Sequence, residues 1–596
     1  MSAIANSSSR DSLLRMAAGN VLARTLHPAR HVLRKTGPLR LRELKQHMPR
    51  PLIITSAAQA ADMCRGIWHL AGHEARATGA VIFDHHDMPP PWLRELHAFE
   101  WLFSLLEGSQ PLRLMHARAL LLDWLQRARA RKLPDAASEP VVLACRLINW
   151  TAAAPALLQE ADSGFQHHFL QGLAQQFRQV QRALLPGLDA PARLLLRLSR
   201  AWATLALMQE VSTRTKALEE LGEELAEQFL PDGGHISRSP AWLLRIMQLL
   251  LPLRQAAEEA GLPLPAAMEQ AMARGLPMLR MLSHADNGLA LFHGGRARQH
   301  RLLELVLTHD DTGGAPLDFA PQSGYARLAR AGAVALVDVG APPPLLANAH
   351  GALSPLALEF SVAGKRIITS CGLPWRADEE LDNAARASAA HSMPVLMDED
   401  AGQMLSNGII RRLLGSSAVS GPPVQAELQQ AAEGILLSAT HDAWAHRYGF
   451  STHRRLFLSS DGRDLRGEDA FLPAQGSTAP SAATPPTFCI RFHLHPGVRA
   501  TLARDGACVM LMLPDRSGWL FSARGATLSL EESMLLAGRH GPRRSVQIVL
   551  RGTCSPEGCR INWRLRQQGE GRKPRRRAKH TSAPALPLQQ QTGEKA

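Results

Sequence analysis

Two tyrosines occur in the 596 residues of the chain, and one of them, Tyr325, follows the flexible Ser-Gly pair of "PQSGYARLARAG". A phenol can give or take a proton in catalysis when nearby positive charge lowers its pKa from about 10. The tyrosine also precedes the first segment with a strand-like pattern, which places it beside a domain boundary, where ligand sites often lie. Tyr325 is therefore the first candidate for a chemical role. The alternative is a ring that packs at the start of a strand.

Three histidines are the next candidates, because imidazole exchanges protons near neutral pH. His235 lies in "DGGHISRSP", His350 in "ANAHGALS" and His391 in "RASAAHS". Each of them could instead be a hydrogen-bonded structural residue. Arg238, three residues after His235, carries a cationic fork that would suit a carboxylate or a sulfate.

The hydrophobic pattern divides the chain into two halves that must position these residues. From about Pro89 to Met281, apolar residues recur at spacings of three and four, as in "LLLRLSRAWATLALMQEV", which predicts helical hairpins in an α-solenoid or a curved α/α barrel. After Gly313 the period becomes two, as in "AVALVDVG", "KRIITSCG" and "RSVQIVLRG", which predicts antiparallel strands. We expect the boundary between Asn287 and Gly324.

Charge is concentrated at the two ends of the chain. The net charge is +14, and residues 1–50 hold ten Lys or Arg against two Asp or Glu, while residues 561–596 hold nine against two. The body between them is therefore nearly neutral. A dedicated nucleic-acid binder usually carries a basic face on its fold, so nucleic acid is not an expected partner. Residues 570–596 are predicted to be disordered, because a charged, weakly hydrophobic segment cannot bury enough apolar surface to fold.

Cysteine spacing and hydropathy exclude some classes of protein. The seven cysteines form no CxxC pair and are not a disulfide framework. "CSPEGC", Cys554 to Cys559, could close a hairpin disulfide, although two reduced thiols are the expectation. We predict no membrane span, because no apolar run approaches the roughly 18–20 residues required. A continuous apolar stretch typical of a signal peptide is also not visible, so the sequence alone predicts a cytoplasmic protein.

Several segments, in their order along the chain, resemble the heparinase II/III-like polysaccharide lyases, and within them a bacterial branch of undefined substrate. The resemblance runs from about Pro89 to Arg566, and its segments include "LINW", "LPDGGHISRSP", "DNGLALFHGG", "SGYARL", "LEFSVAGKRIITSCG" and "RASAAHS". It implies an α+β multidomain chain, an incomplete α/α toroid followed by an antiparallel β-sandwich. The expected parts are a basic segment (1–50), the helical domain (51–310), the β-sandwich (311–568) and a basic tail (569–596).

The resemblance also implies a function. Lyases of this family cleave an acidic, uronic-acid-containing glycan by β-elimination, which makes the expected enzyme a carbon–oxygen lyase acting on polysaccharides. Tyr325 matches the tyrosine to which the family assigns proton transfer, with His235 and His350 assisting. Substrate would be held by Asn149, Arg238, Trp242, Arg386 and His391. The alternative is a catalytically inactive glycan-binding or envelope-polysaccharide assembly protein with the same fold.

The chain departs from the family pattern in ways that favour this alternative. Many members carry a His-x-His-x-Asp element where this chain has His350 and no aspartate. A structural zinc needs four ligands, whereas His350, Cys371 and His391 would supply three, so no cofactor is certain and a structural zinc is only suggested. The family's Asn-His-Leu motif is not recognisable. The family usually works in the periplasm or cell envelope, in contrast to the cytoplasmic location that the sequence alone predicts.

Truncation after Gly569 should leave the melting temperature nearly unchanged. The removed segment is rich in Arg, Pro and Gln and offers almost no apolar side chain to a core. Thermal unfolding of the full chain and of the truncated chain, followed by circular dichroism, provides the comparison. A fall of many degrees in the truncated chain would contradict the prediction.

Overall fold

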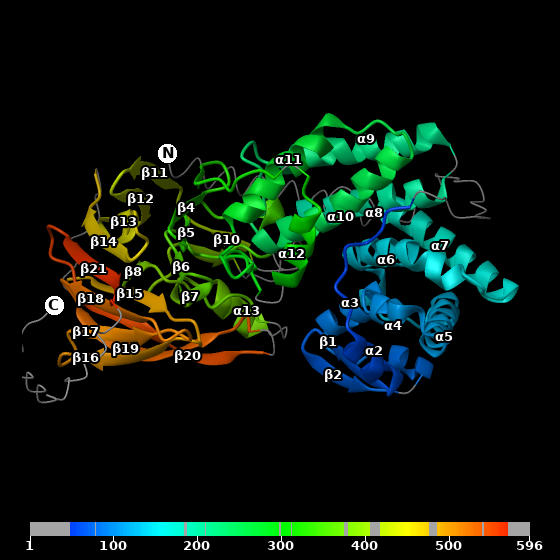
Figure 1. The fold of residues 1–596 in the computed structure, drawn as a ribbon, viewed down its shortest axis with the longest axis horizontal. Helices are drawn as coiled ribbons and strands as arrows, with labels where there is room; N and C mark the ends of the chain where they lie inside the picture. Colours follow the sequence, from blue (N-terminus) through cyan, green and yellow to red (C-terminus); the bar gives the residue numbers. More distant parts are fainter. Residues whose placement is uncertain are drawn as a thin grey trace, which may run out of the picture.

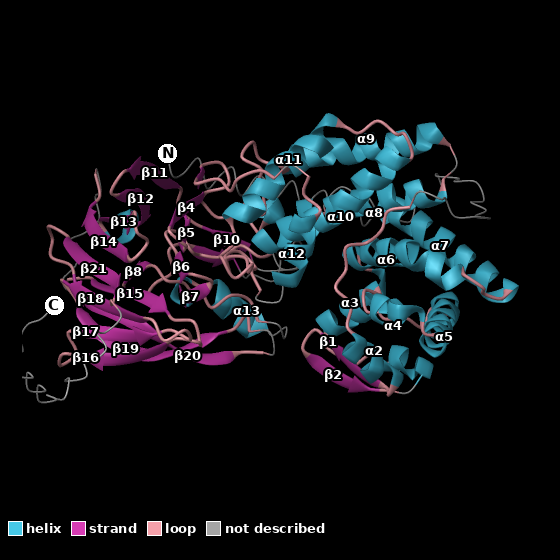
Figure 2. Ribbon diagram, in the orientation of Figure 1, coloured by secondary structure: helices cyan, strands magenta, loops and turns pink. Residues whose placement is uncertain are grey.

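The structure is a computed structural model that describes residues 48–569, apart from 78, 184–187, 209, 297–299, 312, 375–378, 406–417, 476–484 and 539–540. The predicted disordered tail, 570–596, and most of the basic segment 1–50 lie outside the described residues. A helical N-terminal region is followed by a sheet-rich C-terminal region, as the change of hydrophobic period predicts (Figure 2). The last helix before the strands ends at Thr308, and the first strand of the sheet-rich region begins at Phe319.

The helices of the first region follow one another in an arc (Figure 1). Several begin with proline, whose fixed φ suits the first helical turn, and Ser56, Asp189 and Ser239 cap helices by accepting a hydrogen bond from a backbone N–H. The helices are α2 (Ala57–Cys64), α3 (Pro90–Ala98), α4 (Leu102–Leu106), α5 (Pro111–Arg129), α6 (Pro140–Leu158), α7 (Ser163–Ala183), α8 (Ala190–Leu207), α9 (Val211–Gln228), α10 (Pro240–Glu259), α11 (Ala266–Met281) and α12 (His300–Thr308). Short 3-10 turns are η1 (Gly79–Asp84), η2 (Glu107–Ser109) and η3 (Asp135–Ser138), and a hairpin joins β1 (Ile67–Leu70) to β2 (His73–Arg76).

Helix α6 is the most apolar helix of the arc and lies in its interior. By length and composition it is the one helix among the described residues that could cross a membrane, but two thirds of it is buried against other helices. Its Arg146 is fully buried, donates hydrogen bonds to Gln176 and to the backbone oxygens of His97 and Ala137, and stacks over the Trp124 ring at 4.5 Å. This pattern is typical of the core helix of a globular region.

The second region is built from antiparallel sheets. The five-stranded sheet that adjoins the helices has the order β3 (Phe319–Ala320), β4 (Tyr325–Arg330), β5 (Ala333–Asp338), β6 (Leu358–Val362), β7 (Lys365–Ile368). An eight-stranded sheet has the order β11 (Val424–Ala431), β12 (Gly434–Trp444), β13 (Phe450–Ser459), β14 (Asp464–Pro473), β21 (Cys559–Gln567), β18 (Gly518–Arg524), β17 (Cys508–Met512), β16 (Arg499–Ala503).

A four-stranded sheet, with the order β19 (Thr527–Leu535), β20 (Arg543–Thr553), β15 (Thr487–His493), β8 (Pro394–Leu396), packs on the eight-stranded one. Phe492 of the smaller sheet contacts Phe521 and Trp563 of the larger, with ring centroids 5.1 and 4.8 Å away. The remaining elements are β9 (Gln403–Leu405) paired with β10 (Ala418–Ser420), the helices α13 (Glu379–Arg386) and α15 (Ala445–Tyr448), and the 3-10 turns η5 (Leu345–Ala347) and η6 (Ser388–Ala390).

Cys554 and Cys559 differ from the expectation of two reduced thiols. The structure joins them in a disulfide across the turn between β20 and β21, with their Cα atoms 5.0 Å apart. The reason is local: Ser555 and Gly558 form a β-bridge that folds the turn tightly and brings the two cysteines within the Cα separation that a disulfide requires.

A bidentate ion pair lies in the interior of the sheet-rich region. Arg454 of β13 is directly opposite Asp469 of β14 and donates to it from Nε at 2.6 Å and from Nη2 at 2.9 Å, with both side chains fully buried. Arg454 Nη1 donates to the backbone oxygens of Leu356 and Ser392, and Trp563 Nε1 donates to the Asp469 carboxylate. The pair therefore joins the eight-stranded sheet to the loops that lead into β6 and β8.

Arg454→Met should lower the free energy of unfolding by about 3–5 kcal/mol, because it leaves the Asp469 carboxylate buried without its cation. The double variant Arg454→Met, Asp469→Leu should recover most of this loss. Urea unfolding followed by tryptophan fluorescence measures both.

The matched control is Arg455→Met, one residue along the same strand. Arg455 is more than half exposed and lies 3.9 Å from Glu468, so its loss should cost less than about 1 kcal/mol. Equal destabilisation by Arg454→Met and Arg455→Met would refute the importance of the buried pair.

Candidate functional site

Tyr325 is buried at the junction of the two regions. It is the first residue of β4, is 2% exposed, and has its ring 6.0 Å from Phe292 on one side. The guanidinium of Arg238 lies 4.9 Å from the ring centroid, and the Tyr325 hydroxyl donates a hydrogen bond to the backbone oxygen of Arg238. Burial raises the pKa of Tyr325 far above its usual value, and the nearby Arg238 only partly offsets this. The phenol therefore stays protonated and its proton is already donated within the protein.

Arg238 connects the loop between α9 and α10 to the five-stranded sheet. Its Nε donates to the Ser323 oxygen at 2.8 Å, its Nη2 to the Gly324 oxygen at 2.9 Å and to the Asp338 carboxylate, and its Nη1 to the Ala341 oxygen. Its side chain is 6% exposed. The cationic fork that the sequence suggested for substrate is thus occupied by the protein's own backbone and by one carboxylate.

Two glycines make room for this guanidinium. A Cβ atom on Gly324 would lie 2.9 Å from Arg238 Nη2, and one on Gly340 would lie 2.8 Å from Arg238 Cζ. Gly324 also has a φ of 71°, in the left-handed region that glycine adopts readily. The backbone of the sheet is therefore shaped around the Arg238 side chain.

Asp338, the last residue of β5, is the anion of the junction. Besides Arg238, it accepts a hydrogen bond from Ser354 Oγ at 2.7 Å, and it lies 3.0 Å from His293 Nε2. Burial alone would raise the pKa of the Asp338 carboxyl, but Arg238 and His293 outweigh burial and hold this pKa well below its usual range. Asp338 is consequently ionised at every physiological pH.

Two histidines lie in this environment. His293 Nδ1 accepts a hydrogen bond from the Ala352 backbone N–H at 3.1 Å, which leaves the Nε2 proton on the side of Asp338, and its ring is 6.5 Å from that of Tyr325. His391 Nδ1 is 3.0 Å from Ser370 Oγ, while its Nε2 is buried without a hydrogen-bond partner. Burial, together with the neighbouring His293, lowers the pKa of His391 to about 3. Burial also lowers the pKa of His293, and Asp338 opposes this shift.

His235 and His350, the two histidines expected to assist Tyr325, have other surroundings. His235 is buried in the loop before Arg238, where Nδ1 accepts from the Ser237 backbone N–H at 3.0 Å and Nε2 lies 2.8 Å from Gln228 Oε1. Burial lowers its pKa to about 3. His350 is exposed in the turn before β6, next to Gly294. His235 is therefore well placed to orient the Arg238 loop, and neither histidine contacts the Tyr325 hydroxyl.

The other expected substrate ligands each contact other parts of the protein. Asn149 is buried and donates to the Ala98 oxygen at 2.8 Å. Trp242 is half-buried, with its ring edge-on to His235. Arg386 is buried, with Nε donating to the Gly351 oxygen at 2.6 Å and Nη2 to the Asn348 oxygen at 3.3 Å. Each of them has a role inside the fold.

The suggested zinc ligands do not assemble either. Cys371 Sγ faces His493 Nδ1 at 3.7 Å rather than His350 or His391, and burial raises the pKa of its thiol to about 12, which disfavours the thiolate that zinc binds. Across the described parts of residues 48–569, no three His, Cys, Asp or Glu side chains are grouped so that they could hold a metal ion. His350, Cys371 and His391 are thus not brought together as a metal-binding group in this part of the chain.

The sequence reasoning missed His293 and Asp338. His293 stands in "DNGLALFHGG", a segment used only as a marker of resemblance, and Asp338 ends the apolar strand "AVALVDVG". A carboxylate at the end of a strand that is buried at all six positions must find a cation. The need of this carboxylate for a cation was the signal that could have marked Asp338 in the sequence. In the structure, Arg238 is that cation.

The buried histidines should make stability depend on pH. His235 and His391 have folded pKa values of about 3, below the ordinary 6.5 of an unfolded chain, so the unfolded state binds more protons between these values. Their contribution is complete above about pH 6.5 and is lost as the pH falls toward 3. We expect the free energy of unfolding to fall by up to about 1.4 kcal/mol per pH unit for each such histidine. Urea unfolding from pH 7 to pH 4 measures the slope.

The variant His235→Gln should have a slope that is shallower by about one proton. His168 is exposed and bonds only to the Gly164 oxygen, so His168→Gln is the control that should leave the slope unchanged. Identical slopes for wild type and His235→Gln would show that His235 titrates normally in the folded protein.

Comparisons with known proteins agree with this fold. Residues 312–564 match the model of the heparinase II/III-like C-terminal domain. The chain is 34% identical over 536 residues to FtsZ-localized protein C of Caulobacter vibrioides (strain NA1000 / CB15N), covering 87% of this chain and 89% of that protein. Two solved structures, each 12% identical, share the fold: heparinase III, with a TM-score of 0.67 over 88% of this chain and 87% of that one, and the heparan sulfate lyase HepC of Pedobacter heparinus, with 0.56 over 92% and 88%. The chain therefore belongs to the heparinase II/III-like family.

Proposed function

We propose that this protein is a catalytically silent member of the lyase fold that acts at the site of cell division together with FtsZ, and that it keeps a glycan-binding role. The first part is supported by the 34% identity to FtsZ-localized protein C over most of both chains, against 12% for heparinase III and for HepC. The second part is supported by the shared fold of these two enzymes, one of which is a heparan sulfate lyase.

The proposed loss of catalysis is supported by the burial of Tyr325, whose ring and hydroxyl both contact Arg238. β-Elimination at a uronic acid needs a group that neutralises the carboxylate, a base for the C5 proton and an acid for the departing oxygen. Here the phenol already donates to the Arg238 backbone oxygen, and the guanidinium is paired with Asp338. A substrate would have to displace both interactions before it could meet either group.

A retained lyase activity on an acidic glycan is the second candidate. It is favoured by the position of Tyr325, whose ring lies 6.5 Å from His293, because a phenol beside an imidazole can exchange protons. It would require Arg238 to leave its carboxylate partner, which costs about 3–5 kcal/mol for a buried pair. For that reason the non-catalytic function is preferred.

Neither wild type nor Tyr325→Phe should produce unsaturated uronate from a panel of uronic-acid polymers, which ultraviolet absorbance detects. The substitution should instead lower the free energy of unfolding by about 1 kcal/mol, since it removes one buried hydrogen bond. Tyr448→Phe is the matched control at the other tyrosine. Tyr448 is only half-buried and donates to Glu399, so its loss should cost less. A wild-type absorbance signal that disappears in Tyr325→Phe would establish the lyase.

The division part of the proposal is tested in cells. A fluorescent fusion expressed in the source bacterium should form a band at the division site that disappears within one division period after FtsZ is depleted. A fusion of the same fluorescent protein without this chain is the control. A uniform distribution in cells that contain FtsZ would overturn this part of the proposal.

A further inference from the structure

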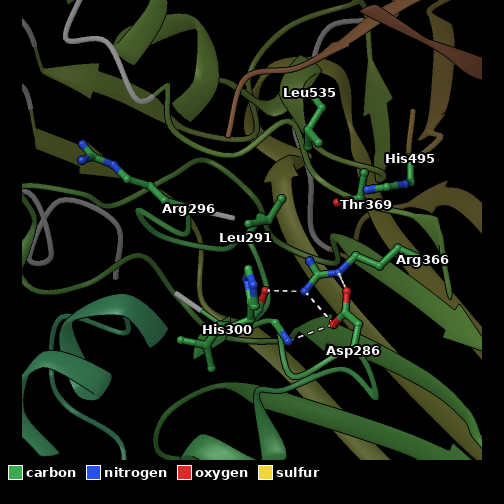
Figure 3. Close-up of a pocket in the computed structure, with 10 residues that line it drawn as sticks. Asp286, Leu291, Arg296, His300, Arg366, Thr369, His495 and Leu535 are labelled. Carbon is green, nitrogen blue, oxygen red and sulfur yellow. Dashed lines mark hydrogen bonds and ion pairs between the residues drawn. The ribbon is translucent and has the colours of Figure 1, made fainter. Parts of the chain in front are cut away.

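A cavity of about 180 Å³ opens where the loop after α11 meets the sheet-rich region (Figure 3). Neither Tyr325 nor Arg238, whose backbone oxygen accepts from the Tyr325 hydroxyl, lines this cavity. The residues that line it include two charged residues, two uncharged polar residues and two leucines: Asp286, Arg366, Thr369, His495, Leu291 and Leu535.

The cavity offers hydrogen-bond donors that the protein does not use. Arg366 is 9% exposed, and its Nε and Nη2 donate to Asp286 at 2.9 and 3.3 Å. Its Nη1 makes no hydrogen bond within the described residues, lies 3.7 Å from Glu359 Oε2, and is on the side of the guanidinium away from Asp286 in Figure 3. This nitrogen therefore presents N–H groups to the cavity.

His495 supplies a second donor. Its Nδ1 accepts a hydrogen bond from the Gly497 backbone N–H at 3.2 Å, so the ring proton is on Nε2. Burial lowers the pKa of His495 to about 4, and Arg366 contributes to this shift, so the ring is uncharged at neutral pH. No hydrogen bond to Nε2 is formed by the part of the chain that the structure describes.

The same cavity offers acceptors. Asp286 is one-third exposed; its Oδ1 accepts from Arg366 and from the Gly288 backbone N–H, whereas its Oδ2 accepts only from Arg366 and keeps a lone pair. The Thr369 hydroxyl donates to the Ser370 oxygen at 3.1 Å, which leaves its own oxygen free to accept. Donors and acceptors thus face one space.

Charge decides which class of ligand this space suits. The Arg366 cation and the Asp286 carboxylate neutralise each other, and Arg296, at the rim, directs its guanidinium away from them in Figure 3. An anionic ligand would meet Asp286, and a cationic ligand would meet Arg366. A hydroxyl group both donates and accepts hydrogen bonds. A ligand with neighbouring hydroxyls can therefore bond to the donors and to the acceptors of the cavity. The buried Leu291 and Leu535 provide an apolar wall for C–H groups.

We propose that this cavity binds one ring of an uncharged, polyhydroxylated molecule, namely a neutral sugar unit. Its volume of about 180 Å³ is well above the roughly 10–15 Å³ that one water molecule needs, and gives room for a single pyranose ring. The proposal rests on the glycan-binding part of the proposed function and specifies a neutral unit, in contrast to an acidic one. Positioning at the division site does not depend on it.

The test is isothermal titration of the whole protein with methyl glycosides of glucose, galactose, mannose and N-acetylglucosamine, and with methyl glucuronide as the charged counterpart of the glucoside. At least one neutral glycoside should bind with a Kd of about 1 mM, and the glucuronide at least tenfold more weakly, because its carboxylate faces Asp286. Binding of the glucuronide as tight as that of the glucoside, or no binding of any neutral glycoside, would overturn the proposal.

Variants assign the binding to this cavity. Leu535→Phe should fill it, and Thr369→Val should remove one acceptor at nearly constant shape; each should weaken binding at least tenfold. Leu502→Phe, at an exposed leucine of the same region, is the control and should bind like wild type. The melting temperature of every variant is measured, so that Thr369→Val decides the matter if Leu535→Phe unfolds. Unchanged binding in a folded Leu535→Phe would place the sugar elsewhere.

The two proposals can fail separately. If the glycosides bind as expected but the fluorescent fusion is uniformly distributed, the cavity is correct and the division role is wrong. If the fusion of Leu535→Phe still forms its band and the wild type binds no glycoside, the division role stands and the cavity proposal fails.

Discussion

The buried pair of Arg238 and Asp338 is the interaction on which the rest of the junction depends. Removing two charges from water is expensive, and their attraction compensates for the cost only when every remaining polar atom is also satisfied. Arg238 comes from the helical region, and its partners come from the sheet-rich region: the backbone oxygens of Ser323 and Gly324 accept from the guanidinium, and Ser354 donates to the carboxylate of Asp338. The ring of Tyr325 packs against the Arg238 guanidinium. The helical and sheet-rich regions are held together by electrostatics as well as by apolar contact.

A second polar contact lies close to the first and strengthens the same junction. His284, in the loop after α11, contacts Ser361 Oγ at 2.7 Å and Glu359 Oε2 at 3.0 Å, and Glu359 also accepts from the Leu291 backbone N–H. The loop from His284 to His293 is thus bonded to the five-stranded sheet at both of its ends. A loop fixed at both ends is rigid. Because this loop forms one wall of the cavity beside Arg366, its rigidity keeps the cavity open without a ligand.

The sequence predicted the fold better than the site. The hydrophobic period alone separated the helices from the strands, and the order of short segments led to the family. Both signals can be read along the chain without knowing which distant residues pack together. Tyr325 was recognised as special for a reason that also proved structural: it is one of two tyrosines and lies at the junction. The role of Arg238 was not predictable in the same way, because burial depends on packing between residues about a hundred positions apart. Asp338 is the partner that an arginine at that depth requires, and only the folded chain brings the two together.

The glycines beside Arg238 have a consequence for how such a protein can evolve. Any side chain at Gly340 would collide with the guanidinium, and loss of either Arg238 or Asp338 would strand the other charge in the interior. Single variants at these positions would each be less stable than the present chain. Tyr325 therefore cannot become exposed through a series of single substitutions of small cost, and the junction resists stepwise change.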